Sequence, residues 1–336
     1  MTISEIAKEA GVSIATISRV LNNGPVSKAT REHVESTILR LNYIPESFVS
    51  NIVNTPTKAI AVVTHGLSNY FSMEFAEAVS ERYYDEGVIF YLCCNRDPQS
   101  EYRNLMDLMA RGIDGIILHD PANENYKSGI YHEITKRVPI VVVHSFPSEQ
   151  DFNSITVDQK KGMKKVMQYL LAQGHKDIVF IRGTEEHYSM VLKEKIWRES
   201  LIEGGIVPDP QNIVKIQESD TDRAIQNTED VLSIFFKKGR HPTAIFTCND
   251  LIGIGALNAA RDQGFSIPGD ISIISHDNTT LAASSRLTTV DMKISSVANA
   301  AVDLMKYALD GKDVTPRHIT ITPDLVLRNS VAKPFI

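Results

Sequence analysis

Four apolar stretches of this sequence each end at a histidine. They read AVVTH (61–65), GIILH (115–119), VVVHS (141–145) and SIISH (272–276), in a chain with only ten histidines among 336 residues. Imidazole nitrogens bind zinc, move protons in catalysis, and form hydrogen bonds with ligands. The pattern therefore indicates a metal site, a catalytic site, a ligand pocket, or histidines that cap strands by hydrogen bonds. Choosing among these four possibilities requires the secondary structure that positions the histidines.

These stretches belong to a regular alternation of short apolar runs and amphipathic helical stretches that begins near residue 58. One series places strands at 59–63, 88–94, 115–119 and 139–143, with helices near 72–86, 100–111 and 127–136. A second series follows 154–158, with strands at 177–181, 212–216, 244–248 and 271–275, and helices near 160–173, 190–203, 222–236 and 250–263. Continuous apolar strands between helices indicate parallel sheets covered on both faces, hence two similar doubly wound lobes. Ligands bind at the carboxyl ends of such strands, where all four histidines are expected.

The first 45 residues have a different, purely helical pattern. Thr2 and Glu5 form a capping box, and Ser13 and Ser27 are expected to cap a second and a third helix. The turn between the second and third helices lies at NNGP (22–25). Two short helices joined by a tight turn and covered by a third helix are typical of a helix-turn-helix unit.

Composition excludes some protein classes. With 43% hydrophobic and 23% charged residues and a net charge of −6, the chain is typical of a globular protein and not of a basic nucleic-acid coat. The N-terminus lacks the apolar stretch of a signal peptide, no run has the length of a membrane span, and the three cysteines show no metal or disulfide spacing. We therefore expect a cytoplasmic, nucleoid-associated protein without a membrane partner.

The segment TISEIAKEAGVSIATISRVLNNGPVSKATREHVESTILRLNYIP (2–45) closely resembles the headpiece of the lactose repressor/galactose repressor (LacI/GalR) family of bacterial transcription regulators. RGIDGIILH (111–119), LLAQGHKDIVFIRG (170–183) and HPTAIFTCNDLIGIGALNAARDQGFSIPGDISIISHDN (241–278) are similar to the effector domain of that family. The resemblance covers nearly the whole chain. It implies an α/β protein in which an all-α helix-turn-helix headpiece precedes a two-lobed, doubly wound, periplasmic-binding-protein-like effector domain.

The resemblance also implies domain boundaries. The headpiece would span 1–45, a hinge helix and linker 46–57, and the effector-binding and dimerisation domain 58–336. Within that domain the chain would cross between lobes three times, giving an N-lobe of about 58–158 and 288–320 and a C-lobe of about 159–287 and 321–336.

In the headpiece, the second helix is the recognition helix of the family. Ile14 and Ala15 would meet base edges in the major groove, and Arg19 would pair with guanine or, alternatively, contact a phosphate or solvent. Hydroxyl and amide groups would lie near phosphates, and Ile52 would be the minor-groove wedge. The DNA-binding residues are therefore expected to be Thr2, Ser13, Ile14, Ala15, Thr16, Ser18, Arg19, Asn22, Ser27, Thr30, Tyr43 and Ile52. Because five Lys or Arg balance five Glu over residues 1–50, we predict a shallow dependence of DNA affinity on salt.

Between the lobes, the family binds its effector through polar and aromatic side chains. The positions carried over, together with the strand-end histidines, are His65, Ser68, Asn69, Phe71, His119, His144, Tyr188, Asn249 and Asp277. The sequence departs from the family pattern at His144, Val191 and Met292. If histidines touch the effector, partly protonated imidazoles would favour an anionic effector such as an acidic or phosphorylated sugar; histidines that only cap strands remain the alternative. Zinc is disfavoured because strand ends rarely converge to the 2 Å ligand distance that zinc needs.

Catalytic constellations are missing from the sequence, so we expect no enzyme, no cofactor and no metal. The predicted function is a DNA-binding transcription regulator, a repressor, whose affinity for a near-palindromic operator is controlled by a sugar or sugar derivative. An exported sugar-binding protein would share the lobes but would need a signal peptide and no headpiece. No leucine heptad follows the effector domain, so a homodimer is expected.

Overall fold

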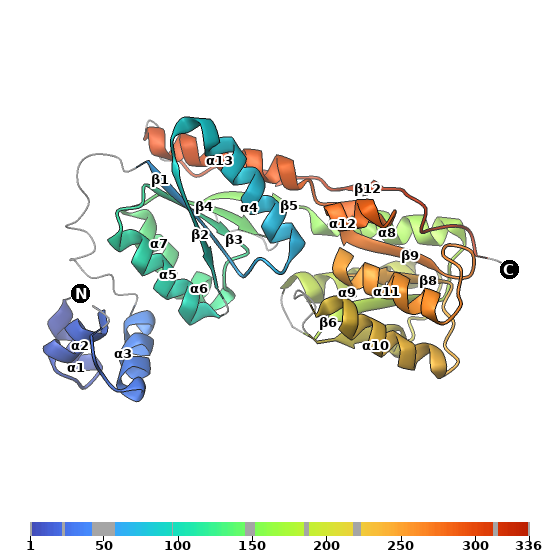
Figure 1. The fold of residues 1–336 in the computed structure, drawn as a ribbon, viewed down its shortest axis with the longest axis horizontal. Helices are drawn as coiled ribbons and strands as arrows, with labels where there is room; N and C mark the ends of the chain where they lie inside the picture. Colours follow the sequence, from blue (N-terminus) through green and yellow to red (C-terminus); the bar gives the residue numbers. More distant parts are fainter. Residues whose placement is uncertain are drawn as a thin grey trace.

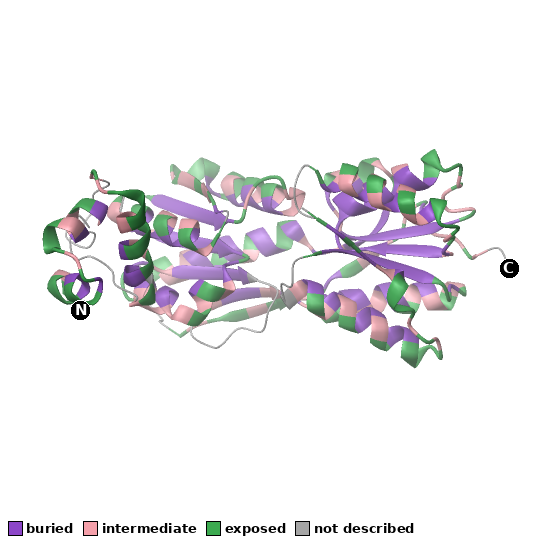
Figure 2. Ribbon diagram, turned by 90° about the horizontal axis from the view of Figure 1, so that it is seen from below, coloured by how far each residue is buried: buried purple, intermediate pink, exposed green. Residues whose placement is uncertain are grey.

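The computed structural model describes residues 2–21, 24–41, 58–95, 97–144, 152–184, 188–217, 223–311 and 315–334. These residues form a small helical headpiece and two α/β lobes arranged in a row, with the headpiece beside the first lobe (Figure 1). Buried residues are concentrated on the strands of both lobes and on the helix faces turned toward them (Figure 2). The predicted fold class is confirmed.

Three helices make up the headpiece: α1 (Ile3–Glu9), α2 (Ile14–Leu21) and α3 (Lys28–Arg40). The backbone N–H of Thr2 donates to Glu5 Oε2 at 2.7 Å, and the N–H of Glu5 donates to Thr2 Oγ1 at 3.3 Å, so the predicted capping box is confirmed. Ile6, Ile17 and Val34 contribute one fully buried side chain from each helix. This small shared core holds the three short helices together.

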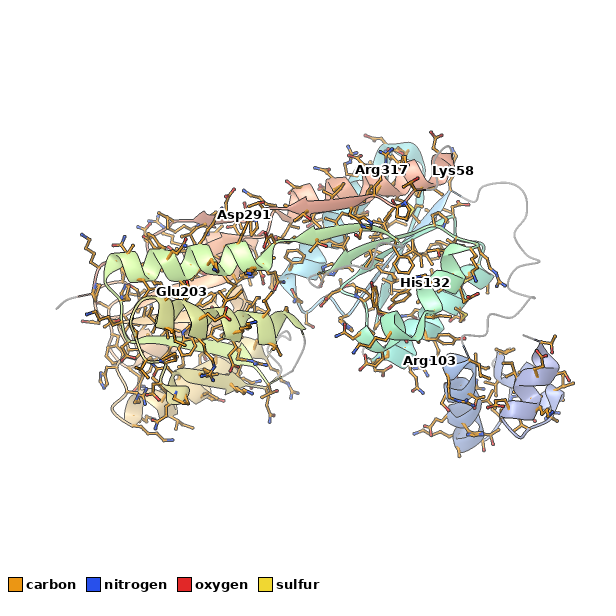
Figure 3. All side chains as sticks on the ribbon, turned by 180° about the vertical axis from the view of Figure 1, so that it is seen from behind. Lys58, Arg103, His132, Glu203, Asp291 and Arg317 are labelled. Atoms are coloured by element: carbon orange, nitrogen blue, oxygen red, sulfur yellow. The ribbon has the colours of Figure 1, made fainter. Side chains whose placement is uncertain are left out.

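The N-lobe is a six-stranded, fully parallel sheet in the order β11-β5-β4-β3-β1-β2. Its elements are β1 (Ala59–Thr64), α4 (Tyr70–Tyr83), η2 (Tyr84–Glu86), β2 (Ile89–Cys94), α5 (Pro98–Ala110), β3 (Gly115–His119), α6 (Asn123–Ser128), α7 (Ile130–Thr135), β4 (Ile140–His144), β5 (Asn153–Val157), α13 (Ile294–Asp310) and β11 (His318–Ile321). The single helix predicted near 127–136 is two helices, because the chain takes a left-handed turn at Gly129, with φ 81°. Arg103 on α5 faces the headpiece, with its Nη1 atom 3.5 Å from Glu35 of α3 (Figure 3).

The C-lobe sheet has the order β12-β10-β9-β8-β6-β7, and only its edge strand β12 is antiparallel. Its elements are α8 (Gln159–Gln173), β6 (Ile178–Gly183), α9 (Tyr188–Glu203), η3 (Pro210–Asn212), β7 (Ile213–Ile216), α10 (Ala224–Lys237), β8 (Ala244–Thr247), α11 (Asp250–Asp262), β9 (Ser272–Asp277), α12 (Thr280–Ser284), β10 (Thr288–Asp291) and β12 (Asp324–Val326). The last described residues complete this lobe, since Ile273 N–H donates to Ser330 O at 2.7 Å and Ala332 N–H donates to Ser272 Oγ at 3.0 Å.

Both lobes repeat one strand order, and the chain crosses between them three times. The second crossing follows Asp291 and not residue 287 as predicted, because β10 pairs with β9 in the second sheet. Asp324, just after the third crossing, receives hydrogen bonds from Lys165 Nζ at 2.8 Å and Lys293 Nζ at 2.9 Å. These ion pairs join segments next to all three crossings, so they hold the hinge region as one unit.

Candidate functional site

The recognition helix α2 presents one exposed face. Ile14 is 50% exposed, and Ala15 and Arg19 are also exposed, while Ile17 and Val20 are buried in the headpiece core. The three side chains predicted to meet base edges therefore share the solvent side of a short helix. That placement suits insertion into a major groove.

The predicted phosphate-contacting hydroxyls lie at helix starts. Ser13 Oγ accepts from Thr16 N–H at 3.1 Å, and Ser27 Oγ accepts from Thr30 N–H at 3.1 Å, so both predicted caps are confirmed. Capped first turns of this kind aim free backbone N–H groups outward, where phosphates are favourable. Ser18, on α2, is partly exposed. The predicted contacts at Asn22, Tyr43 and Ile52, and the predicted hinge, lie outside the described residues.

Arg31 has a structural role that the sequence did not reveal. Its guanidinium donates to Gly24 O at 2.8 Å and to Val20 O at 3.2 Å, bridging the turn between α2 and α3. Charged hydrogen bonds of this type contribute about 1.5–3 kcal/mol each when they are shielded from water. Arg31 therefore helps to set the position of the recognition helix relative to α3.

Two other headpiece cations are engaged in ion pairs. Arg40 lies 2.9 Å from Glu9, and Lys28 lies 3.8 Å from Glu32. On α2, Arg19 makes no ion pair with any residue that the structure describes. Arg19 is thus the long cation on this helix that is available for DNA, and the shallow salt dependence stays a prediction.

In the N-lobe, His119 is at the end of β3, which lies between β4 and β1 in the sheet. His119, and not His65, therefore follows the middle one of the three strands that end at His65, His119 and His144. His119 stacks on Phe71 and Phe75, with ring centroids 5.4 and 4.9 Å away. Its Nδ1 atom is 3.0 Å from Thr64 Oγ1. Burial lowers the pKa of His119 to about 4, so the ring is neutral at physiological pH.

In the C-lobe, His276 is 1% exposed near the end of β9. Its Nδ1 atom lies 2.9 Å from Asp277 Oδ1 and 3.4 Å from Lys193 Nζ, and its Nε2 atom is buried without a hydrogen-bond partner. Burial, and then the charge of Lys193, lower the pKa of His276 well below its ordinary value. The premise of protonated imidazoles is therefore wrong for both buried histidines.

The remaining predicted positions are less informative. His65 and Ser68 are exposed in the loop after β1 and do not line the pocket described next. The side chains of His144 and Tyr188 lie outside the described residues. Among the residues described, no three His, Cys, Asp or Glu side chains are grouped so that they would hold a metal ion.

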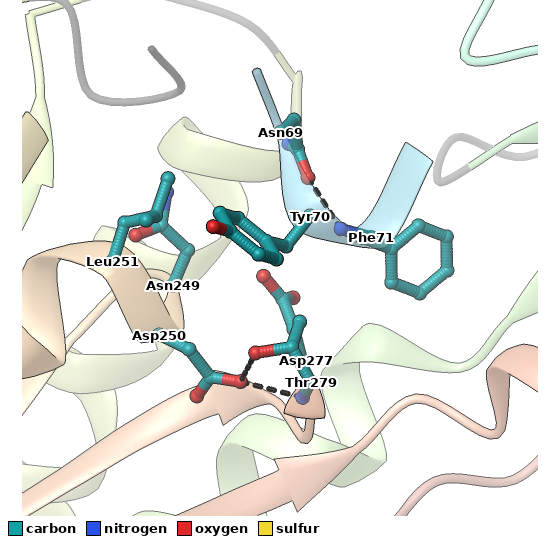
Figure 4. Close-up of a pocket in the computed structure, with 8 residues that line it drawn as sticks. All are labelled: Asn69, Tyr70, Phe71, Asn249, Asp250, Leu251, Asp277 and Thr279. Atoms are coloured by element: carbon teal, nitrogen blue, oxygen red, sulfur yellow. Dashed lines mark hydrogen bonds between the residues drawn. The ribbon is translucent and has the colours of Figure 1, made fainter. Parts of the chain in front are cut away.

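A small pocket lies between the two lobes, and four of the predicted residues line it. The lining comprises Asn69, Tyr70 and Phe71 from the N-lobe and Asn249, Asp250, Leu251, Asp277 and Thr279 from the C-lobe. Figure 4 shows the Tyr70 ring reaching toward Asn249 and Asp277, with the Phe71 ring on the other side. An aromatic side chain beside a carboxylate and amides suits a polyhydroxylated ligand.

Two helices from different lobes begin at this pocket. Asn69 Oδ1 accepts from Phe71 N–H at 2.9 Å at the start of α4, and Asn249 Oδ1 accepts from Ile252 N–H at 3.0 Å at the start of α11. Each helix contributes a partial positive charge at its N-terminus. Both N-termini therefore favour negative charge at the pocket, whose wall also carries the carboxyl groups of Asp250 and Asp277.

Asp250 is a buried carboxylate that sequence reasoning missed. It accepts hydrogen bonds from Thr279 N–H at 2.8 Å, Thr279 Oγ1 at 2.9 Å and Thr289 Oγ1 at 2.8 Å, and also from Ser275 Oγ. Burial raises its pKa, and these donors oppose that rise. Asp250 thus joins α11 to β9, β10 and the pocket residue Thr279. The signal in the sequence was an acidic residue directly after a helix cap.

Comparison with known proteins follows the same division of the chain. Residues 2–46 match bacterial regulatory proteins of the lacI family, and residues 167–331 match the periplasmic binding protein-like domain. HTH-type transcriptional regulator DegA of Bacillus subtilis (strain 168) is 30% identical, covering 98% of both chains, and catabolite control protein A of Priestia megaterium is 29% identical, covering 98% of this chain and 99% of that protein.

Solved structures agree on the fold. A complex of transcriptional regulator CelR with cellobiose has a TM-score of 0.72 at 22% identity, covering 98% of this chain and 99% of that one. The lac repressor dimer bound to operator and the anti-inducer ONPF has a TM-score of 0.70 at 24% identity, covering 99% of each chain. No described helix is long and apolar enough to cross a membrane. The full-length relatives are transcription regulators and not enzymes, and this chain belongs to the lacI family of bacterial transcription regulators.

Proposed function

We propose that this regulator binds a near-palindromic operator as a homodimer in the cytoplasm, and that a sugar or sugar derivative bound between the lobes controls its affinity for the operator. The observation that carries this proposal is the composition of the pocket wall, which takes residues from the first turn of α4 in one lobe and of α11 in the other. A ligand that contacts both lobes stabilises one of their relative orientations. We propose that binding to the operator represses transcription.

On the DNA side, Ile14, Ala15 and Arg19 would read base edges, while the capped starts of the headpiece helices would lie against phosphates. The exposure of these three side chains supports this assignment. A homodimer places two such helices about one helical turn of DNA apart. In the effector pocket, the Phe71 ring would pack against one face of the ligand, and the Asp277 carboxylate would accept hydrogen bonds from the ligand's hydroxyl groups.

The test has two stages. Sugars and their derivatives are screened by thermal shift, and operator DNA is obtained by selecting tight-binding sequences from a random pool. Operator binding is then measured with and without each hit. We expect a hit to change operator affinity in the wild-type protein and to do so weakly in Asp277→Asn. Leu67→Ala, exposed outside the pocket, is the matched control. Hits that bind without any effect on operator affinity would contradict the proposal.

A further inference from the structure

A hydrogen bond joins the two lobes directly beside the effector pocket. Glu74 on α4 of the N-lobe accepts from the backbone N–H of Thr280, the first residue of α12 in the C-lobe, at 2.8 Å. Figure 1 shows α4 and α12 on either side of the place where the lobes meet. Glu74 lies about one helical turn after the lining residue Tyr70, and Thr280 directly follows the lining residue Thr279. The bond is therefore at the edge of the pocket wall.

Through this bond, Glu74 supplies a cap that α12 does not obtain from its own lobe. The first N–H groups of a helix have no partner within the helix, and the side chain of the preceding residue usually caps one of them. In α12 that residue is Thr279, which makes no capping hydrogen bond and whose hydroxyl donates to Asp250 at 2.9 Å instead. The Thr280 N–H is thus capped across the boundary between the lobes, and separation of the lobes would remove the cap.

The C-lobe end of the bond is tied firmly to its own lobe. Asp250 also accepts from the N–H of Thr279 at 2.8 Å, and Asn278 Oδ1 accepts from Arg328 at 2.6 Å. The segment that leads into α12 therefore moves with the C-lobe, and so does the N–H of Thr280. Its acceptor moves with α4 of the N-lobe. A change in the relative orientation of the lobes must stretch or break this hydrogen bond.

The bond is accessible to water, so it can break and form again reversibly. Thr280 is exposed and Glu74 is only partly buried. On the side away from the effector pocket, the same two residues line an open groove. When the lobes separate, water can satisfy both groups, and a charged hydrogen bond at such a site gives a modest preference rather than a permanent link.

We propose that the hydrogen bond between Glu74 and the Thr280 N–H is a latch that favours the lobe orientation described here, and that it thereby adjusts the affinity for the operator before any effector binds. This inference rests on the effector-binding function proposed above, in which the effector acts through the same orientation. A ligand shifts such an equilibrium only by the difference between its affinities for the two orientations. The latch sets the starting point of that shift from outside the pocket.

Two substitutions remove the latch from opposite lobes. Glu74→Ala removes the acceptor, and Thr280→Pro removes the donor. Proline suits position 280 because this is the first residue of α12 and because Thr279 before it is extended, with φ −71° and ψ 167°. Thr280→Ala keeps the backbone N–H, and Glu77→Ala removes a neighbouring carboxyl group from the same helix, so these two variants are the matched controls.

Small-angle X-ray scattering on the full chain, without added ligand or DNA, measures the separation of the lobes. We expect the radius of gyration to increase in Glu74→Ala and in Thr280→Pro, and to increase no further in the double variant, because both changes remove the same bond. The two controls should match the wild type. An unchanged radius in both latch variants, or increases that add in the double variant, would overturn the inference. This result requires neither effector nor operator, so it can fail while the proposed function holds.

The second measurement is the affinity for the selected operator without effector. We expect the Kd to differ from that of the wild type by roughly three- to tenfold, and by the same factor in both single variants and in the double variant. A change in the radius of gyration without a change in operator affinity would show that the latch holds the lobes without regulating DNA binding, and the inference would fail. Failure of the proposed function would instead appear in the wild type, as operator affinity that no bound sugar changes.

Discussion

Replacing Asp250 with alanine removes the acceptor that joins four donors behind the effector pocket. The Thr279 N–H cannot turn to another acceptor, and leaving it buried and unsatisfied costs about 1–3 kcal/mol. The hydroxyl donors of Ser275, Thr279 and Thr289 can rotate, so each loses only about 0.5–1 kcal/mol. The alanine variant also avoids burying a carboxylate, which offsets part of the loss. We expect a net destabilisation of about 2–4 kcal/mol.

Urea denaturation measures this change directly. Trp197 is the single tryptophan of the chain, and it is fully buried in α9 of the C-lobe, so its fluorescence reports unfolding of the lobe that holds Asp250. Asp262→Ala, an exposed change at the other end of α11, is the matched control and should shift stability by less than about 0.5 kcal/mol. A loss below about 1 kcal/mol in Asp250→Ala would refute the reasoning that these hydrogen bonds hold the wall together.

Three other changes follow from the site and the hinge. Arg19→Ala should weaken binding to the selected operator by about 1–3 kcal/mol more than binding to scrambled DNA, as measured by fluorescence anisotropy, and an equal loss on both DNAs would assign Arg19 to phosphate. Lys8→Ala, in α1, is its control. Phe71→Ala should reduce effector affinity in calorimetry at least tenfold, since it removes both the pocket face and the ring stacked on His119, and unchanged affinity would place the ligand elsewhere. Two lysines hold the pKa of Asp324 at about 2, so its stabilisation is present above pH 4 and is lost as pH falls toward 2. The difference in thermal midpoint between the wild type and Asp324→Asn should therefore shrink over that range, and a constant difference would contradict the ion-pair role.

Much of the architecture was predictable because it rests on local patterns. Apolar runs separated by amphipathic stretches gave the strands and helices of both lobes, and the hydroxyl residues at 2, 13 and 27 gave the three headpiece helix starts. The positions of the histidines at strand ends were also predictable. Strand ends meet at one sheet edge whatever the details of packing, so the edge that carries the pocket followed from the order of elements.

Side-chain direction was not predictable, since it depends on packing between distant segments. The sequence placed His119 at the correct edge, yet its ring stacks on Phe71 and Phe75 and does not line the pocket. Lys193 is one of several lysines on an amphipathic helix, and only the fold shows that it is buried while Lys195 is exposed. The hydrogen bonds from Arg31 to the carbonyls of Val20 and Gly24 likewise depend on the packing of α3 against α2.

Because the chain crosses between the lobes three times, the parts of the protein can fold only in a certain order during synthesis. The headpiece is one contiguous segment, so it can fold on the ribosome as soon as residue 41 has emerged. Neither lobe can be completed so early, because the N-lobe waits for α13 and β11, and the C-lobe waits for Ser330 and Ala332. A premature stop anywhere before these residues therefore leaves a headpiece attached to unfinished lobes. Such a fragment would have the surface that meets DNA without the means to be switched by its effector.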